Sequence, residues 1–192
     1  IPSTISGTAT MIAKSEGVLA GIGISLSVFE RVDQSIQTES IMFDGTALNP
    51  GDVIARVYGP APSILKAERV ALNFIQKLSG IATTTAAFAN IVHDLPVRIV
   101  DTRKTTPGLR TLEKYAVIAG GGYNHRQGLG DGILIKDNHI AILRKHGWTI
   151  QNIVRQAIFK ASHTLQVEVE VENLEDARAA VEGGAHILLL DN

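Results

Sequence analysis

Residues 165–192 decide the fold, and their sequence is "LQVEVEVENLEDARAAVEGGAHILLLDN". The stretch opens with valine and glutamate in alternation, which is the period-two pattern of a β-strand. A segment with helical spacing follows at 173–184, and "HILLLDN" at 186–192 reads as a second strand. A strand, a helix and a second strand in this order form a βαβ unit with parallel strands. The sequence therefore predicts a parallel sheet covered by helices.

The same alternation of strand and helix extends back along the chain to residue 97. The predicted strands are "VRIVDTR" (97–103), "GILIKDN" (132–138), "LQVEVEVE" (165–172) and "HILLLDN" (186–192). The predicted helices between them cover 108–120, 148–161 and 173–184. Steady alternation is typical of parallel α/β folds. Two such folds compete, the doubly wound open sheet and the eight-stranded barrel.

The ends of the predicted strands distinguish these two folds. Every strand finishes in polar residues, namely Asp101 to Lys104, Lys136 to Asn138, the glutamates 168, 170 and 172, and Asp191 with Asn192. In a barrel, functional side chains come from the carboxyl ends of several strands and face one mouth, whereas an open sheet binds its ligand at one switch point. No G-x-G-x-x-G motif follows the first predicted strand. We therefore expect a parallel α/β barrel.

Only about the first half of such a barrel is expected in this chain. Four strands are predicted, whereas a closed barrel has eight strands and about 250 residues. An open half barrel would expose its last strand, 186–192, as an apolar edge, which natural proteins avoid. We therefore expect the chain to be truncated from a longer one.

Residues 1–92 differ in pattern and are predicted to form an N-terminal α/β domain that precedes the catalytic barrel domain at 93–192. Short alternating segments bounded by glycine indicate strands in its first 60 residues. Apolar residues at helical spacing predict a helix over 63–91, broken near Ser79 and Gly80. This helix is expected to bridge the two domains.

Composition and charge narrow the classes of function. Hydrophobic residues make up 45% of the 192 residues, which is enough for a sizeable core. Lys plus Arg number 18 and Asp plus Glu 19, which argues against nucleic acid or an anionic membrane as a partner. There is no cysteine, so disulfides, thiolate zinc sites and cysteine nucleophiles are excluded. With no signal peptide or membrane-spanning run expected, the cytoplasm is the default location.

The polar residues expected at the barrel mouth separate by charge. The cations are Arg103, Lys104, Arg126 and Lys136, with His125 beside them, and the acids on the later strands are Glu170 and Asp191. Clustered cations bind carboxylates or phosphates through charge-assisted hydrogen bonds. Carboxylates across the same mouth can hold Mg²⁺ or ribose hydroxyls. A phosphorylated sugar together with a second acid would satisfy both groups.

Each of these residues also has an ordinary structural interpretation. Arg103 and Lys104 could be solvated loop residues, but an apolar run precedes them and "TTPG" supplies turn residues that fix their direction. The glutamates of 167–172 could form a solvated strand face, but in a parallel barrel the outer face packs on helices, which favours an inward position. Three glycines at 120–122 let a backbone approach a ligand, although such runs more often mark a flexible turn. We favour the functional interpretation for the charged residues and read His139 as a residue that orients its neighbours.

Six ordered motifs resemble those of the quinolinate phosphoribosyltransferase family, also called nicotinate-nucleotide pyrophosphorylase (carboxylating). They are "ERVALNFIQKLSGIAT" (68–83), "DTRKTTPGLRTLEKYAV" (101–117), "GGGYNHRQGL" (120–129), "ILIKDNHI" (133–140), "VEVEVENLEDA" (167–177) and "ILLLDN" (187–192). The resemblance covers nearly the whole chain. It implies transfer of a phosphoribosyl group from phosphoribosyl pyrophosphate to quinolinate, giving nicotinate mononucleotide, pyrophosphate and CO₂ for NAD biosynthesis.

The resemblance also implies roles for individual residues. It assigns quinolinate binding to Arg69, Arg103, Arg126 and Lys136 with His125 alongside, substrate contact to Thr102 and Lys104, and the ribose and Mg²⁺ side to Glu170 and Asp191. Lys136, Glu170 and Asp191 are the implied catalytic residues, and no covalent nucleophile is expected. Mg²⁺ is expected to arrive with the pyrophosphate. Arg69 is implied to reach the site of a neighbouring subunit, which makes the protein an obligate homodimer or a larger oligomer.

The chain departs from the family pattern at one position and leaves other functions open. Gly130 stands where the family usually has an aromatic residue, which we expect to loosen the loop without affecting a charged ligand. The family's phosphate loops follow later strands and are expected outside this chain. One alternative is the molybdenum-transport-associated paralogue, whose substrate is unknown. Others are a class I aldolase-like barrel with a Schiff base on Lys136, or a ligand-binding fragment without catalysis.

Overall fold

A computed structural model describes residues 1–2 and 4–191. The chain divides into two compact units, Ile1–His125 and Arg126–Asn192. The boundary between these units differs from the predicted domain boundary at residue 92, which stays a prediction. Asn192, predicted at the end of the last strand, lies outside the described residues.

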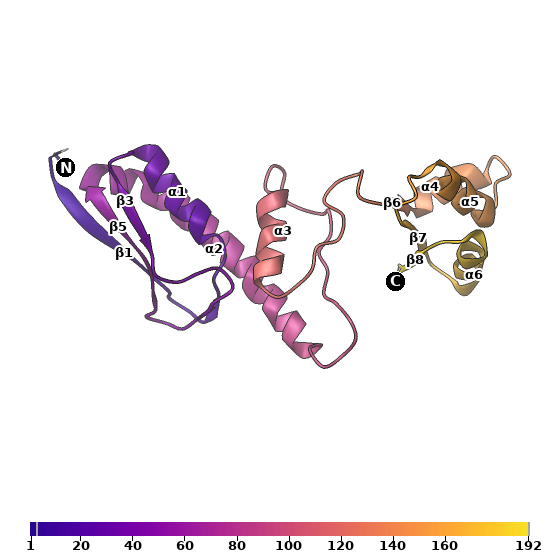
Figure 1. Cartoon of the computed structure of the whole chain (residues 1–192), viewed down its shortest axis with the longest axis horizontal. Coiled ribbons are helices and arrows are strands. Elements are labelled where there is room, and N and C mark those ends of the chain that lie inside the picture. The colour runs from indigo at the N-terminus through magenta and orange to yellow at the C-terminus, as the bar shows by residue number, and fades with distance from the viewer. Residues whose placement is uncertain (3, 192) are drawn as a thin grey trace. The chain divides into compact units, whose positions relative to one another are not determined.

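Among its described residues, the first unit combines antiparallel strands with three helices, of which α1 lies between β2 and β3 and the other two follow β5 (Figure 1). A three-stranded sheet has the order β1-β5-β3, and a two-stranded ladder joins β2 to β4. The bounds are β1 Ser6–Ile12, β2 Gly17–Val18, α1 Ile22–Val32, β3 Gln37–Ser40, β4 Ala47–Leu48, β5 Val53–Pro60, α2 Ala61–Ile91 and α3 Arg110–Ala119. The predicted α/β character of this region is confirmed.

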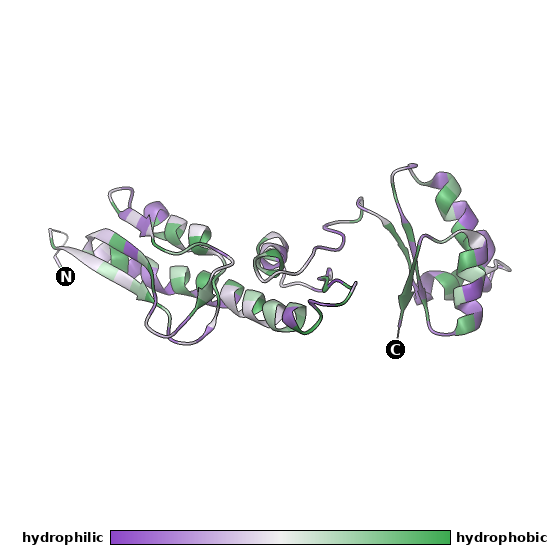
Figure 2. Ribbon diagram, turned by 60° about the horizontal axis from the view of Figure 1, so that its bottom comes forward, coloured by the Kyte–Doolittle hydropathy of each residue, from purple (hydrophilic) through white to green (hydrophobic). Residues whose placement is uncertain are grey.

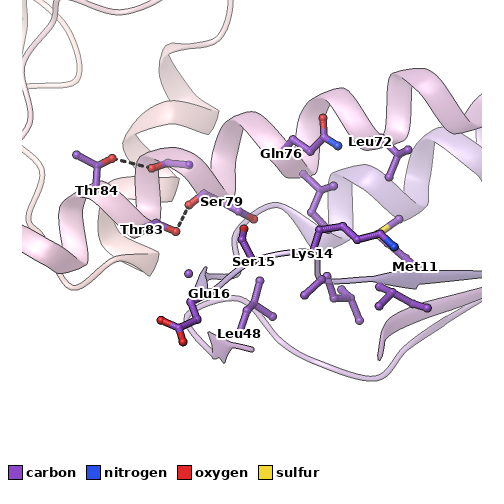
Figure 3. A pocket seen from close by; sticks show the side chains of 16 residues that line it. Met11, Lys14, Ser15, Glu16, Leu48, Leu72, Gln76, Ser79, Thr83 and Thr84 are labelled. Atoms are coloured by element: carbon purple, nitrogen blue, oxygen red, sulfur yellow. Dashed lines mark hydrogen bonds between the residues drawn. The ribbon is translucent and has the colours of Figure 1, made fainter. Parts of the chain in front are cut away.

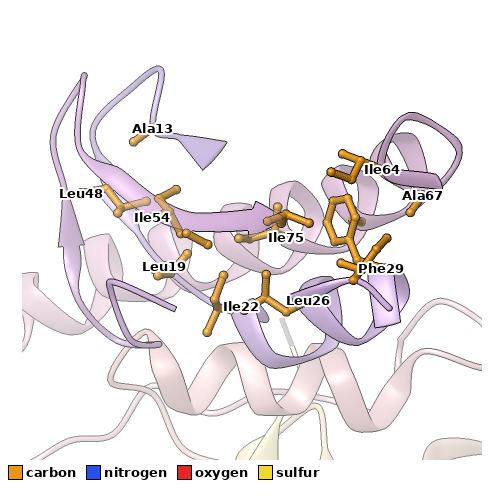
Figure 4. Packing of buried hydrophobic residues seen from close by; sticks show 14 residues of the cluster. Ala13, Leu19, Ile22, Leu26, Phe29, Leu48, Ile54, Ile64, Ala67 and Ile75 are labelled. Carbon is orange, nitrogen blue, oxygen red and sulfur yellow. The ribbon is translucent and has the colours of Figure 1, made fainter. Parts of the chain in front are cut away.

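Aliphatic side chains and one phenylalanine form the core of the first unit (Figure 4). They come from the sheet and from the facing sides of α1 and α2, and include Leu19, Ile22, Leu26, Phe29, Leu48, Ile54, Ile64 and Ile75. Full burial of a side chain of this size contributes about 1.5–3 kcal/mol. Packing between α1 and α2 therefore holds the long helix against the sheet.

Helix α2 is continuous over Ala61–Ile91, so the predicted break near Ser79 and Gly80 was wrong. The Ser79 hydroxyl accepts a hydrogen bond from the backbone N–H of Ala20 at 3.0 Å, which fixes the helix to the strand region at this point. A glycine inside a helix costs only about 1 kcal/mol relative to alanine. The burial of Leu78 and Ala82, before and after Gly80 in the helix, outweighs that cost.

The second unit contains a parallel sheet whose strands follow chain order, β6-β7-β8. The bounds are β6 Ile133–Ile135, α4 Asp137–Arg144, α5 Ile150–Lys160, β7 Val167–Val171, α6 Leu174–Gly183 and β8 Ile187–Leu190. Consecutive strands lie side by side without the reversal that marks a doubly wound sheet. This order agrees with the predicted part of a parallel α/β barrel.

The helices of this unit all lie on one side of its strands (Figure 2). Val167, Val169 and Val171 of β7 are buried in a core with Ile153 and Val154 of α5. Because side chains alternate across a strand, the glutamates between these valines lie on the opposite face of the sheet. The predicted inward position of the glutamates is therefore confirmed for β7.

Two predictions about elements were wrong. The predicted strand at 97–103 is reduced to one parallel bridge, in which Val100 pairs with Tyr123. Among the described residues, the parallel sheet of the predicted barrel domain, 93–192, therefore has three strands and not the four expected. Helix α4 was missed, because its first residues, Asp137 and Asn138, were assigned to the polar end of the predicted strand 132–138.

The last strand, β8, forms an apolar edge. Leu190 is 77% exposed, and Ile187 and Leu189 are each 39% exposed. An exposed last strand was predicted for an open half barrel, and the exposure of Ile187–Leu190 agrees with it. None of the helices among residues 1–2 and 4–191 has the length and apolar character that crossing a bilayer requires.

Glycines 120–122 allow the end of α3 to pack against α2. A Cβ on Gly120 would lie 2.3 Å from the carbonyl oxygen of Ala82, and one on Gly122 would lie 2.7 Å from Cγ2 of Thr85. Contacts this short are incompatible with any side chain. Residues 120 and 121 form the predicted turn, in which Gly121 has a φ of 84°, and Gly120 and Gly122 also serve close packing.

Replacement of Gly120 is expected to destabilise the first unit. Gly120→Ala should lower the free energy of unfolding by about 2 kcal/mol, because the new methyl group meets a backbone oxygen that cannot move independently. Gly23→Ala is the matched control, since a Cβ there meets nothing within 4 Å, and it should be neutral or stabilise by about 0.5 kcal/mol. Urea unfolding followed by circular dichroism measures both. Equal stability of the two variants would contradict this account.

Candidate functional site

The site residues of the first unit lie on two segments that run side by side. The backbone N–H of Tyr123 donates to the carbonyl of Ile99 at 2.9 Å, and the N–H of Asp101 donates to the carbonyl of Tyr123 at 3.1 Å. Thr102, Arg103 and Lys104 continue from the first segment, and His125 from the second. The bridge therefore brings predicted residues from two distant motifs to one place.

Asp101, on the first of these segments, forms an ion pair with Lys114 of α3. The side chain of Lys114 is 0% exposed and that of Asp101 is 6% exposed. Oδ1 of Asp101 also accepts the backbone N–H of His125 at 2.8 Å. Sequence reasoning missed Lys114, although "LEKYAV" places a lysine inside an amphipathic helix, where a buried charge requires a partner.

Helix α3 also contacts residues 105 and 106, which directly follow Arg103 and Lys104. The guanidinium of Arg110 donates to Oγ1 of Thr105 at 3.2 Å, and Oε2 of Glu113 accepts the backbone N–H of Thr106 at 3.1 Å. Burial of Glu113 favours its neutral form, but the bonds from Thr106 and Lys77 outweigh this and lower the pKa of Glu113. The loop that carries Arg103 is thus held by charged groups of α3.

Arg103 itself has unused hydrogen-bonding capacity. Its Nε is buried and has no hydrogen-bond partner among residues 1–2 and 4–191. Buried polar atoms in native proteins are nearly always paired, so such an atom indicates a missing ligand or water. Lys104 and Thr102 are exposed beside it, and the hydroxyl of Thr102 accepts the backbone N–H of Lys104 at 3.0 Å.

The site residues of the second unit share one face of the parallel sheet. Ile135 pairs with Val169, which brings Lys136 level with Glu170, and Glu170 pairs with Leu189. Asp191 lies two residues beyond Leu189 and so on the same side of the sheet. Lys136, Glu170 and Asp191 therefore occupy one face at the carboxyl ends of three neighbouring strands, where the sequence predicted them.

Lys136 and Glu170 form the ion pair of this face, with Nζ and Oε2 3.9 Å apart. The Glu170 side chain is 12% exposed and that of Lys136 is 48% exposed, so the lysine remains accessible to a ligand. The backbone N–H of Lys136 donates to Nδ1 of His139 at 2.9 Å, which leaves the ring proton on Nε2. His139 thus fixes the end of β6, as predicted for an orienting residue.

Arg126 resembles Arg103 in its environment. Its Nε is also buried without a hydrogen-bond partner in the described part of the chain, while NH1 donates to the carbonyl of Gly132 at 3.1 Å. The following loop is closed by Asp131, whose Oδ2 accepts the backbone N–H groups of Gln127 at 2.9 Å and Gly128 at 2.8 Å. A Cβ on Gly130 would meet nothing within 4 Å.

The predicted residues consequently form two groups. The structure places Thr102, Arg103, Lys104 and His125 together in the first unit, and Arg126, Lys136, Glu170 and Asp191 in the second. Arg69 is separate from both: it is exposed on α2, nearly opposite the buried residues of that helix. Within the described residues, Arg69 forms no hydrogen bond or ion pair, and no group of three or more His, Cys, Asp or Glu could hold a metal ion.

A groove of about 570 Å³ in the first unit is not part of this site (Figure 3). Met11, Lys14, Leu72 and Gln76 line it, and none of the predicted residues does. The Thr83 hydroxyl at its wall already accepts the backbone N–H of Val18 at 2.9 Å. The groove is therefore separate from the residues that the sequence predicted for the site.

Consecutive parallel strands with charged residues at their carboxyl ends define the class as α/β barrel proteins. The family model for the N-terminal domain of quinolinate phosphoribosyl transferase matches residues 1–79, and the model for the C-terminal domain of the same family matches residues 81–192. The chain belongs to the quinolinate phosphoribosyl transferase family.

Curated relatives agree with the family models. A protein of Bacillus subtilis named probable nicotinate-nucleotide pyrophosphorylase [carboxylating] is 49% identical over 96% of this chain and 62% of its own length. The chloroplastic nicotinate-nucleotide pyrophosphorylase [carboxylating] of Oryza sativa is 45% identical over 96% of this chain and 49% of its own length. The chain thus spans about half to two thirds of these relatives.

Solved structures resemble the chain over nearly its full length. The crystal structure of NadC from Streptococcus pyogenes is 43% identical and matches with a TM-score of 0.92, covering 100% of this chain and 67% of that chain. The nicotinate-nucleotide pyrophosphorylase from Francisella tularensis is 40% identical, with a TM-score of 0.90 over 98% of this chain and 65% of that chain.

The loop after Arg126 is expected to depend on Asp131 and not on the residue at 130. Asp131→Ala should speed hydrogen exchange of the Gly128 amide about tenfold, because the amide loses a charged acceptor. Gly130→Phe is the control and should leave that rate within about twofold, because the position is open. Exchange followed by NMR measures both. A faster rate in Gly130→Phe alone would contradict this view of the loop.

Proposed function

We propose that this protein transfers the phosphoribosyl group of phosphoribosyl pyrophosphate to quinolinate and decarboxylates the product. The products are nicotinate mononucleotide, pyrophosphate and CO₂, for NAD biosynthesis. Family membership supports the proposal, and so do the names of relatives at 49% and 45% identity. The observation that carries it is the position of Lys136, Glu170 and Asp191 on one face at the strand ends.

Quinolinate is a dianion, and the proposal assigns its binding to the cationic residues. Arg103 and Arg126 each have a buried Nε without a partner in the described chain, which suits a carboxylate ligand. Thr102, Lys104 and His125 lie next to Arg103 or on the segment bridged to it. Planar guanidinium groups bind carboxylates in a fixed bidentate geometry, so they orient the pyridine ring as well as attract it.

Glu170 and Asp191 are assigned to the ribose and to Mg²⁺. Two carboxylates alone make a weak site, but Mg²⁺ in phosphoryl and pyrophosphate complexes typically uses one or two carboxylates together with phosphate oxygens. These two acids fit a metal that arrives with phosphoribosyl pyrophosphate. When bound, Mg²⁺ would neutralise charge on the departing pyrophosphate.

The reaction needs positioning and charge stabilisation more than a covalent nucleophile. The pyridine nitrogen forms a bond to the anomeric carbon as the bond from that carbon to pyrophosphate breaks. Nearby carboxylates stabilise the positive charge that develops on the ribose ring. The pyridinium nitrogen then accepts the electron pair left on the adjacent carbon when CO₂ departs, and a proton replaces CO₂. The cationic residues assigned to quinolinate hold the pyridine ring in position through both steps.

The alternatives receive less support. The relatives carry the name of the carboxylating enzyme and not of the molybdenum-associated paralogue. Nζ of Lys136 lies 3.9 Å from the carboxylate of Glu170, which is an ion-pair arrangement, whereas a Schiff base requires a neutral amine. The proposal includes a cytoplasmic location, supported by a sequence without cysteine.

A shared site in a homodimer is part of the same proposal. Arg69 is exposed on α2 and lies nearly opposite the buried residues Ile64, Ala67 and Ala71. A cation in this position is directed away from its own core and is free to contact another molecule. We assign it to the quinolinate site of a neighbouring subunit.

The full-length protein is expected to release CO₂ from quinolinate only when phosphoribosyl pyrophosphate and Mg²⁺ are present. Lys136→Ala should lower kcat/KM by about 10²-fold, because it removes a cation at the substrate. Lys160→Ala, on the exposed side of α5, is the matched control and should retain activity within about twofold. Release of labelled CO₂ and mass spectrometry of nicotinate mononucleotide measure the reaction. A folded protein that releases no CO₂ would contradict the proposed function.

Mixing two inactive variants tests the shared site. Arg69→Ala and Lys136→Ala should each have little activity. Their equal mixture should regain about a quarter of wild-type activity, because about half of the dimers are hybrids and one of the two sites in each hybrid has neither defect. Activity is measured after subunit exchange at equal concentrations, with each variant alone as control. No recovery in hybrids that have formed would show that each site is built from one subunit.

A further inference from the structure

The buried ion pair between Lys114 and Asp101 is out of direct reach of a substrate. Neither side chain is accessible, with exposures of 0% for Lys114 and 6% for Asp101. Lysine is almost never fully buried unless it is paired, and an apolar residue at this helix position would avoid the cost of desolvating two charges. The contacts made by the pair indicate what it contributes.

The pair fixes the backbone of His125 from both sides. Oδ1 of Asp101 accepts the N–H of His125 at 2.8 Å, and Nζ of Lys114 donates to the carbonyl of the same residue at 3.4 Å. With its amide nitrogen facing the acceptors, Asn124 donates to Oδ2 of Asp101 at 2.6 Å and to the carbonyl of Lys114 at 3.0 Å. Beyond the bridge between Val100 and Tyr123, these side-chain contacts therefore take the place of the backbone hydrogen bonds that would continue a strand pair.

Helix α3 supplies a firm base for these contacts. The Tyr115 hydroxyl donates to Oδ2 of Asp44 at 2.6 Å, and Glu113 pairs with Lys77 of α2 at 3.0 Å. Lys114 lies between these two residues in the sequence, so its backbone is anchored through both neighbours. Movement of Lys114 would require these contacts to change as well.

We propose that Lys114 is a positioning residue that, through Asp101, sets the spacing between the cationic loop Thr102–Lys104 and His125. This inference rests on the proposed function, since the substrate whose two carboxylates require the spacing is quinolinate. Stabilisation by charged groups depends on their being held in place before the ligand arrives. A displacement of about 1 Å can cost on the order of 10²-fold in rate.

The test compares three variants of the full-length protein. Lys114→Met leaves the Asp101 carboxylate buried without its cation and is expected to lose stability. The double variant Lys114→Gln/Asp101→Asn removes both charges, so it should unfold cooperatively near the wild-type temperature. It should nevertheless raise KM for quinolinate and the calorimetric Kd about tenfold, because neutral amides do not hold the two segments equally firmly. Lys160→Met is the control, with KM within about twofold of wild type.

A purely structural role predicts a different result. Fewer folded molecules would lower the apparent kcat and leave KM unchanged, so a KM within about twofold of wild type in the double variant would overturn the inference. Failure of the double variant to fold would assign the pair to stability alone and overturn it equally. Wild-type protein that neither binds nor converts quinolinate would overturn the proposed function, and this inference with it. Wild-type activity with an unaffected double variant would overturn the inference only.

Discussion

Parallel pairing of β6, β7 and β8 is the constraint on which the second unit depends. Because the strands run in one direction with Glu168 paired to both Leu134 and Ile187, their carboxyl ends arrive at the same edge. The same register places Val167, Val169 and Val171 against the helices and the intervening glutamates on the other face. A slip of one residue would reverse the two faces and bury carboxylates among apolar helices. The pairing register of these strands therefore determines both which side chains form the core and which lie at the site.

The charged residues of the first unit have two roles: some hold the backbone in place, and others are available to a ligand. Lys114 and Asp101 neutralise each other out of contact with water and hold backbone groups, whereas Lys104 is exposed and Arg103 keeps a buried Nε without a partner in the described chain. A buried ion pair adds little net stability over apolar residues of similar size, but loss of one partner is costly. Such a pair serves geometry better than stability. Asp101 directly precedes the loop Thr102–Lys104 in the sequence, which agrees with that use.

The parallel sheet and the positions of its polar residues could be predicted from the local sequence pattern. The predictions that failed share one cause. Alternation in 167–171 and the polar residues after each strand gave the parallel sheet and the positions of Lys136, Glu170 and Asp191. The break predicted at Gly80 did not occur, since contacts of Ser79 with Ala20 hold the helix. The turn predicted at the glycine run is present, but the pattern did not reveal that Gly120 and Gly122 lie against Ala82 and Thr85 of a helix far away in the sequence. Each failure involves a partner that local pattern does not identify.

The sequence by itself determined the parallel strands, their polar ends and the set of charged residues, because side-chain periodicity and strand polarity are local properties of the chain. Tertiary structure alone decided that the segment 97–103 forms one bridge with Tyr123, and that Lys114 is buried against Asp101. It also decided that the glycines at 120 and 122 face α2. These features depend on contacts between groups that are far apart in the sequence. The cost of burying a charge, or the need for a glycine, arises only once such a contact has formed.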